Sequence, residues 1–249
     1  MSFKGWIERA VRRRPAYLRS RWAVRTPARS PRRKKSLGQS FVEFAILLPI
    51  LLMMLSGLIE FGFMLNAYLD LIDTAREVAR YLANDDPLHD YNGNFQTSPL
   101  NPDVAQFYTR AWFQTYQTLN NAGQIQINPA SDDLVISVFV VSGNTVTHRY
   151  PDPYTDNVNF PGPGCSEGGD WGWERFCNYH SKLTTADINS KLASLPNVPP
   201  DTGLVLVELF YNYHMVMGLP WIKAFVPDPV TLHAYSIMPN VNAAPTPGP

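Results

Sequence analysis

The arrangement of apolar residues divides the chain into a polar leader, a long apolar run and a mixed C-terminal part. Residues 1–37 show no apolar periodicity and are typical of a disordered segment. Residues 44–65 (FAILLPILLMMLSGLIEFGFML) are 22 residues long and contain one charge, Glu60. A helix needs about 20 apolar residues to cross the hydrocarbon core of a bilayer. The pattern therefore predicts one transmembrane helix.

The helical pattern continues beyond the apolar run but becomes amphipathic. Between residues 68 and 82, apolar side chains recur at helical spacing on one stripe, formed by Leu71, Ala75, Val78 and Leu82. The other face carries i,i+3 pairs of opposite charge, Asp73 with Arg76 and Glu77 with Arg80. One helix over about 41–83 is expected, roughly 64 Å long. Its first half suits lipid, and its outer half is amphipathic and needs a partner surface, so the helix has the shape of a stalk.

Downstream, short periodic elements predict an α+β domain over residues 84–240. Residues 84–100 are rich in turn formers and end the first helix. We expect an antiparallel sheet of about four strands with one or two packed helices, and a disordered tail at 241–249. The helices are expected at 102–121 and 185–195, a helical turn at 220–225, the strands at 134–141, 145–150, 204–214 and 230–237, and a long irregular loop at 151–181.

The net charge of zero conceals a strong asymmetry. Residues 1–38 contain 13 Lys or Arg and one acidic residue, whereas residues 39–249 contain 8 basic and 20 acidic residues. By the positive-inside rule, the leader stays in the cytoplasm and the C-terminal domain lies outside. The leader also suits anionic lipid head groups. A nucleic-acid-binding arm is the competing interpretation, but the adjoining membrane helix explains the charge, so we expect no nucleic-acid partner.

The two cysteines, Cys165 and Cys177, lie in the long loop on the expected outer side. An oxidising exterior favours a disulfide between them, which would contribute roughly 3 kcal/mol in the chain-entropy model. Two free thiols are the alternative. Without histidines at a suitable spacing the cysteines form an incomplete ligand set, so we expect no metal site and no cofactor.

Two acidic residues lie at or in the apolar run. Glu43 is at its cytoplasmic end, five residues after Gly38, where a carboxylate is costly unless function requires it. An interfacial anchor is the alternative for Glu43. Glu60 lies 17 residues further along, or about 25 Å in a helix. We expect it near the outer interface, where its charge reaches water, with a buried contact between subunits as the alternative.

Three segments of this region, 38–49 (GQSFVEFAILLP), 57–62 (GLIEFG) and 75–81 (AREVARY), resemble the TadE-like pseudopilins. These are minor pilin-like proteins of the tight-adherence (Tad, type IVc) pilus system. The resemblance is close over about residues 36–83 and extends loosely to the last two expected strands. Residues 84–200 show no such resemblance.

The resemblance implies that an aspartic prepilin peptidase cleaves between Gly38 and Gln39. Residues 1–38 would be removed, and Gln39 would become the mature N-terminus. Phe44 then occupies the aromatic position of the processing motif. The resemblance also implies that Glu43 pairs with the new α-amino group of a neighbouring subunit and sets the register between stacked helices. Glu60 is a further candidate for assembly.

The sequence contains no nucleophile motif, no H-E-x-x-H segment and no Gly-rich phosphate loop, so we expect no enzyme. The predicted function is that of a minor pseudopilin acting in pilus assembly, initiation and surface adhesion. Its expected partners are the prepilin peptidase, other pilin or pseudopilin subunits, the Tad secretion machinery and membrane lipids. The alternative is a permanent single-pass membrane protein whose outer domain binds a ligand or cell-wall polymer. Cleavage at Gly38 distinguishes the two.

Overall fold

The computed structural model shows a long helix followed by an α+β domain. The chain divides into two compact units, Met1–Pro49 and Ile50–Pro249. In the first unit, the described residues form the start of helix α2 (Leu37–Leu82), and residues 38–49 are all exposed. The described residues are 37–89, 91–94, 102–123, 125–151, 170–194 and 201–244.

Helix α2 contains 46 residues and is long and apolar enough to cross a membrane. It begins four residues earlier than the sequence predicts and ends within one residue of the expected end. The predicted apolar stripe is confirmed, because Leu71, Ala75, Val78 and Leu82 are all buried. The exposed ion pairs are confirmed as well, with Asp73–Arg76 at 3.5 Å and Glu77–Arg80 at 2.8 Å.

The sheet is antiparallel throughout, with strand order β2-β1-β4-β5 and a short β3 also paired with β1. The predicted α+β class and antiparallel sheet are confirmed. One strand was missing from the sequence-based expectation, because β3 is only two residues long and lies in a segment without periodicity. The strands are β1 (Asp133–Ser142), β2 (Thr145–Tyr150), β3 (Trp173–Glu174), β4 (Thr202–Tyr213) and β5 (Val230–Asn240).

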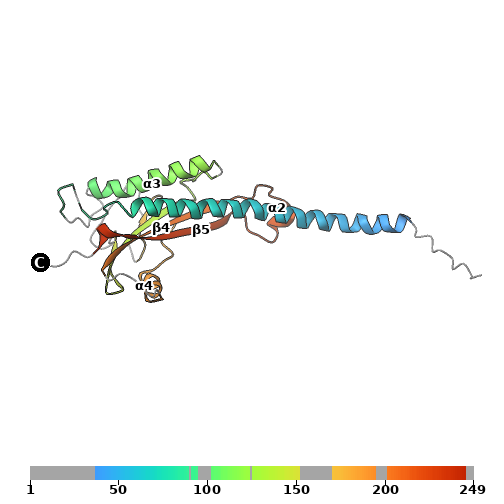
Figure 1. Ribbon diagram of the computed structural model, residues 1–249. Helices are drawn as coiled ribbons and strands as arrows, with labels where there is room; N and C mark the ends of the chain where they lie inside the picture. Colours follow the sequence, from blue (N-terminus) through green and yellow to red (C-terminus); the bar gives the residue numbers. More distant parts are fainter. Residues whose placement is uncertain are drawn as a thin grey trace, which may run out of the picture. The chain divides into compact units, whose positions relative to one another are not determined.

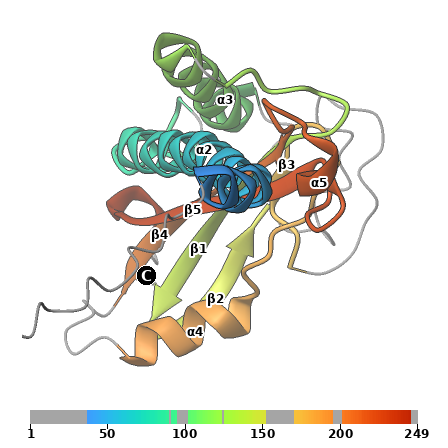
Figure 2. The ribbon, with the colours of Figure 1, turned by 90° about the vertical axis from the view of Figure 1, so that its right-hand side faces the viewer.

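Helices cover both faces of the sheet. The outer half of α2 and helix α3 (Pro102–Ala122) lie on one face, and helix α4 (Thr185–Ser194) lies on the other (Figures 1 and 2). Side chains of β1 alternate accordingly, with Ile136 and Val138 in the α2–α3 core and Phe139 and Val141 in the α4 core. The central strands β1 and β4 are therefore covered on both faces, which explains why their sequences are mostly apolar, with Ser137 and Glu208 as buried exceptions.

The structure corrects the expected start of the disordered tail. Strand β5 runs to Asn240, and a 3-10 turn (Val241–Ala243) follows it. The buried Asn240 amide donates to the carbonyls of Leu82 (2.8 Å) and Asp85 (2.9 Å), so it caps the end of α2. A Pro- and Ala-rich composition does not reveal this anchor. Residues 245–249 lie outside the described residues.

Candidate functional site

The predicted processing site lies in the first turns of α2. Gly38, Gln39, Glu43 and Phe44 are all exposed, and Gln39 Nε2 donates to Glu43 Oε1 over 3.3 Å. Apart from the helix's own backbone, no described atom lies within 4 Å of a Cβ placed on Gly38. The segment is thus accessible, and a peptidase needs to open only the first turn, whose N–H groups have no partners within the helix.

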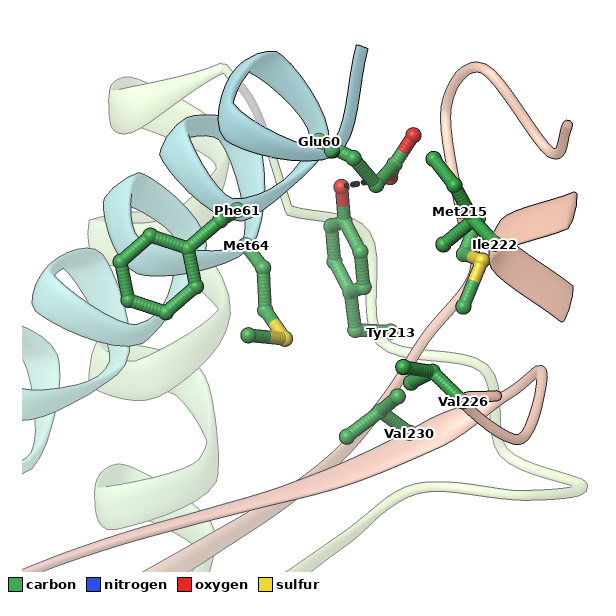
Figure 3. Close-up of a pocket in the computed structure, with 9 residues that line it drawn as sticks. Glu60, Phe61, Met64, Tyr213, Met215, Ile222, Val226 and Val230 are labelled. Carbon is green, nitrogen blue, oxygen red and sulfur yellow. Dashed lines mark hydrogen bonds between the residues drawn. The ribbon is translucent and has the colours of Figure 1, made fainter. Parts of the chain in front are cut away.

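Glu60 is held by the connection between β4 and β5 rather than by water. The residue is 5% exposed. Its Oε1 accepts hydrogen bonds from the Tyr213 hydroxyl (2.7 Å) and the Val216 N–H (2.9 Å), and its Oε2 accepts one from the Met217 N–H (2.8 Å). Figure 3 shows the Tyr213 side chain pointing at this carboxylate. The expectation of a water-exposed Glu60 is therefore not met, and three donors of its own chain surround the charge.

A second contact lies one turn earlier on α2. The Ser56 hydroxyl accepts a hydrogen bond from the Trp221 indole N–H over 3.1 Å and donates to the Met53 carbonyl over 2.8 Å. Trp221 belongs to the short helix α5 (Pro220–Lys223) in the same connection. We call these four residues, Ser56, Glu60, Tyr213 and Trp221, the polar clasp. It joins two chain segments about 150 residues apart.

An apolar pocket adjoins the polar clasp, with about 390 Å³ of empty space including its open mouth. It contains the Glu60 carboxylate among apolar side chains, and the described residues that line it include no second acidic or basic group. The arrangement suits packing of the connection on α2 better than acid–base chemistry. The lining residues are Gly57, Glu60, Phe61, Met64, Tyr213, Met215, Ile222, Val226 and Val230, most of which are labelled in Figure 3.

Contacts within the connection between β4 and β5 also hold its two ends together. Asp228 pairs with Lys223 Nζ at 2.6 Å and accepts the Met215 N–H at 3.2 Å. These two donors hold the pKa of Asp228 below its usual value. Burial, followed by the hydrogen bond to Glu60, raises the pKa of Tyr213, so its hydroxyl remains a donor at neutral pH.

The Asp228 contact is expected to loosen in acid. Its folded pKa lies below its unfolded pKa, so its stabilisation is present above the unfolded value of 3.8 and is lost as the pH falls through the folded pKa. Amide exchange at Met215, corrected for intrinsic rates, should therefore accelerate below about pH 4. Asp228→Asn should lack this acid step. An identical acid profile for both proteins would contradict the assignment.

Buried carboxylates also organise the domain away from α2. Asp133 accepts the backbone N–H groups of Leu134 (2.9 Å), Phe176 (2.8 Å), Asn178 (2.8 Å) and Tyr179 (3.1 Å). Burial raises the pKa of Asp133, and the four donors oppose that rise. The carboxylate thereby fixes the segment after β3 on the end of β1.

A second buried carboxylate, Glu208, binds Ser181, the Lys182 N–H (3.0 Å) and His233 Nε2 (2.9 Å). Ser181 and His233 both contact Glu208, and no hydrogen bond joins them to each other in this described part of the chain. A nucleophilic serine needs the histidine as its base. The cluster is thus a structural network, and it gives no support to an enzyme.

The described part of the long loop packs on α3. Trp173 stacks on Tyr108 at 5.2 Å between ring centroids, and Phe176 meets Trp112 edge to face at 5.1 Å. Cys177 is not a free thiol. Cys165 lies outside the described residues, so the Cys165–Cys177 disulfide stays a prediction.

Most of α2 is similar to a known protein family. Residues 38–80 match the family described as TadE-like protein. The match begins at the predicted cleavage glycine and covers most of α2, and it is a likeness to the TadE-like family over that helix alone. Searches among curated proteins and among solved structures give no match.

The structure leaves Glu43 and Glu60 in different settings. Glu43 is exposed on α2, whereas Glu60 is engaged within the chain. Sequence reasoning missed Tyr213 and Trp221 as partners of α2, and Ser56 as the acceptor of the Trp221 N–H. The available signal was an acidic residue in an apolar run, which requires hydrogen-bond donors, but the sequence does not identify them.

Proposed function

We propose that the protein is a minor pseudopilin of a Tad-type pilus. A prepilin peptidase cleaves between Gly38 and Gln39, and the mature helix then associates with other pilin subunits. The C-terminal domain lies outside the cell and contributes to pilus initiation and surface adhesion. The observation that carries this proposal is the TadE-like match, which starts at Gly38 and includes Glu43.

The exposure of the first part of α2 supports association as the function. Residues 38–55 are exposed without exception, and most are apolar. Such a surface needs lipid or other helices around it. Glu43 is the single acidic residue in this segment, and it has only Gln39 as a side-chain hydrogen-bond partner among the described residues. It is therefore available to the new α-amino group of a neighbouring subunit.

Glu43→Gln is expected to leave cleavage intact and to weaken incorporation among pilin subunits about tenfold or more. A hydrogen bond to a charged group contributes about 1.5–3 kcal/mol, and about 1.4 kcal/mol corresponds to tenfold in affinity. The measurement is the amount of mature protein that co-purifies with sheared pili and Tad components. Glu77→Gln, on the exposed face of the same helix, is the matched control and should behave like the natural protein. Equal incorporation of both variants would contradict the role of Glu43.

A further inference from the structure

The connection between β4 and β5 carries an unusual set of exposed apolar side chains. Phe225 is 86% exposed, Val216 65% and Trp221 38%, and Met217 and Val226 are exposed as well. Exposed apolar side chains that are grouped on one loop mark a site of contact with a membrane or with another protein. The domain thus has a second apolar surface besides the exposed part of α2.

The polar clasp fixes this loop at one level of α2. Trp221 is bound to Ser56, and the N–H groups of Val216 and Met217 are bound to Glu60. These contacts place the exposed apolar side chains beside the turn of α2 that contains Ser56 and Glu60. Figure 3 shows Met215, Ile222 and Val226 of the connection facing the helix across the pocket.

The solvent exposure of α2 changes at the same turn. Residues 38–55 are exposed all around the helix, and from Ser56 onward one face is covered by the domain. Counted from Glu43 at the cytoplasmic end of the apolar run, Ser56 and Glu60 lie about 20 and 25 Å along the helix. This level falls in the outer part of a hydrocarbon layer about 30 Å thick.

We propose that residues 215–226 form an interfacial loop that inserts Val216, Trp221 and Phe225 into the outer leaflet around the chain's own transmembrane helix. The occupant of this apolar surface is lipid at the head-group boundary. An indole that is apolar in its ring and hydrogen-bonded at its N–H suits that depth.

The loop would act as a second membrane contact, which fixes the depth and orientation of the extracytoplasmic domain. Extraction of the subunit from the bilayer would then require both the helix and the loop to leave the lipid. This inference depends on α2 spanning the membrane and not on processing or pilus incorporation, so the two proposals can fail separately.

Spin labels on the full chain in nanodiscs of phosphatidylethanolamine and phosphatidylglycerol, one chain per disc, test the proposal. The variants are Phe225→Cys for the loop, Leu51→Cys as the lipid reference, and Phe113→Cys, an exposed aromatic position on α3, as the matched aqueous control. Each label is measured for collision with oxygen, which concentrates in lipid, and with a water-soluble nickel complex. The unsubstituted chain, treated in the same way, gives any background from Cys165 and Cys177.

The expected result is that the label at position 225 is oxygen-accessible and protected from nickel, like that at position 51, whereas position 113 shows the reverse. Because Phe225 is 86% exposed, its replacement removes little packing, and folding is not at issue. Nickel access at position 225 equal to that at 113 would overturn the proposal. So would protection that appears only when several chains occupy one disc, since a second copy would then cover the loop. An aqueous label at position 51 would overturn it too, because α2 would not span.

Discussion

Glu60→Ala is expected to release the connection between β4 and β5 from α2. The substitution removes the acceptor of three donors, the Tyr213 hydroxyl and the N–H groups of Val216 and Met217. Buried donors without a partner, together with lost hydrogen bonds to a charge, cost about 3 kcal/mol. Amide exchange at Val216 and Met217, followed on the full chain in detergent micelles, should accelerate by about a hundredfold.

The matched control for Glu60 is Glu77→Ala. Glu77 lies on the same helix but pairs with Arg80 on the exposed face, where an ion pair contributes about 0.2–1 kcal/mol. Its substitution should leave exchange in the connection unchanged. In Glu60→Gln, the exchange rates at Val216 and Met217 should lie between those of the natural protein and those of Glu60→Ala. The amide keeps one acceptor oxygen, but its NH2 group faces donors. Unchanged protection of Val216 and Met217 in Glu60→Ala would show that the apolar pocket alone holds the connection.

Asp133→Ala is expected to be the more damaging substitution for the domain. Four backbone N–H groups lose their acceptor, and three of them, at Phe176, Asn178 and Tyr179, belong to a segment without regular structure. A buried donor that loses its partner costs about 1–3 kcal/mol, so the loss of four such contacts is expected to cost about 3–5 kcal/mol after partial rearrangement. The Tm in micelles, read from near-UV circular dichroism, should fall by about 10 °C.

Asp73→Ala is the matched control for Asp133, because its carboxylate is 77% exposed and, among the described residues, pairs only with Arg76 on the surface of α2. Its Tm should stay within about 2 °C of the natural protein. Amide exchange localises the effect of Asp133→Ala, which should begin in residues 176–179 before it reaches β1. A Tm equal to that of the control would mean that the aromatic contacts of Trp173 and Phe176 hold the segment without Asp133.

Much of the fold follows from short-range patterns. The stripe Leu71–Ala75–Val78–Leu82 keeps one periodicity over 12 residues, and a turn precedes strand β2. The end of α2 and the bounds of β2 were therefore predicted within one residue. The α+β class follows from the alternation of such elements. In each case the deciding information lies within one turn or one hairpin of the residue concerned.

The site depends on contacts that no local pattern contains. Glu60 meets Tyr213 and Val216 across more than 150 positions of sequence, and Asn240 caps α2 from the other end of the chain. The polarity of Glu60 shows that it needs donors, but topology decides which segment supplies them. Strand β3 was missed for a related reason, since its two residues form a strand only through their pairing with the distant strand β1.

The most direct test of the proposed function is the N-terminus of the mature chain. The full chain is expressed with and without a cognate prepilin peptidase, and intact-mass spectrometry gives the first residue. We expect Gln39 with the peptidase, and retention of residues 1–38 without it or in Gly38→Ala. Because no described atom beyond the helix backbone lies within 4 Å of a Cβ at Gly38, that variant should fold normally, so its failure to be cleaved would reflect recognition by the peptidase. A chain that keeps its leader beside an active peptidase would contradict the pseudopilin assignment and favour a permanent membrane anchor.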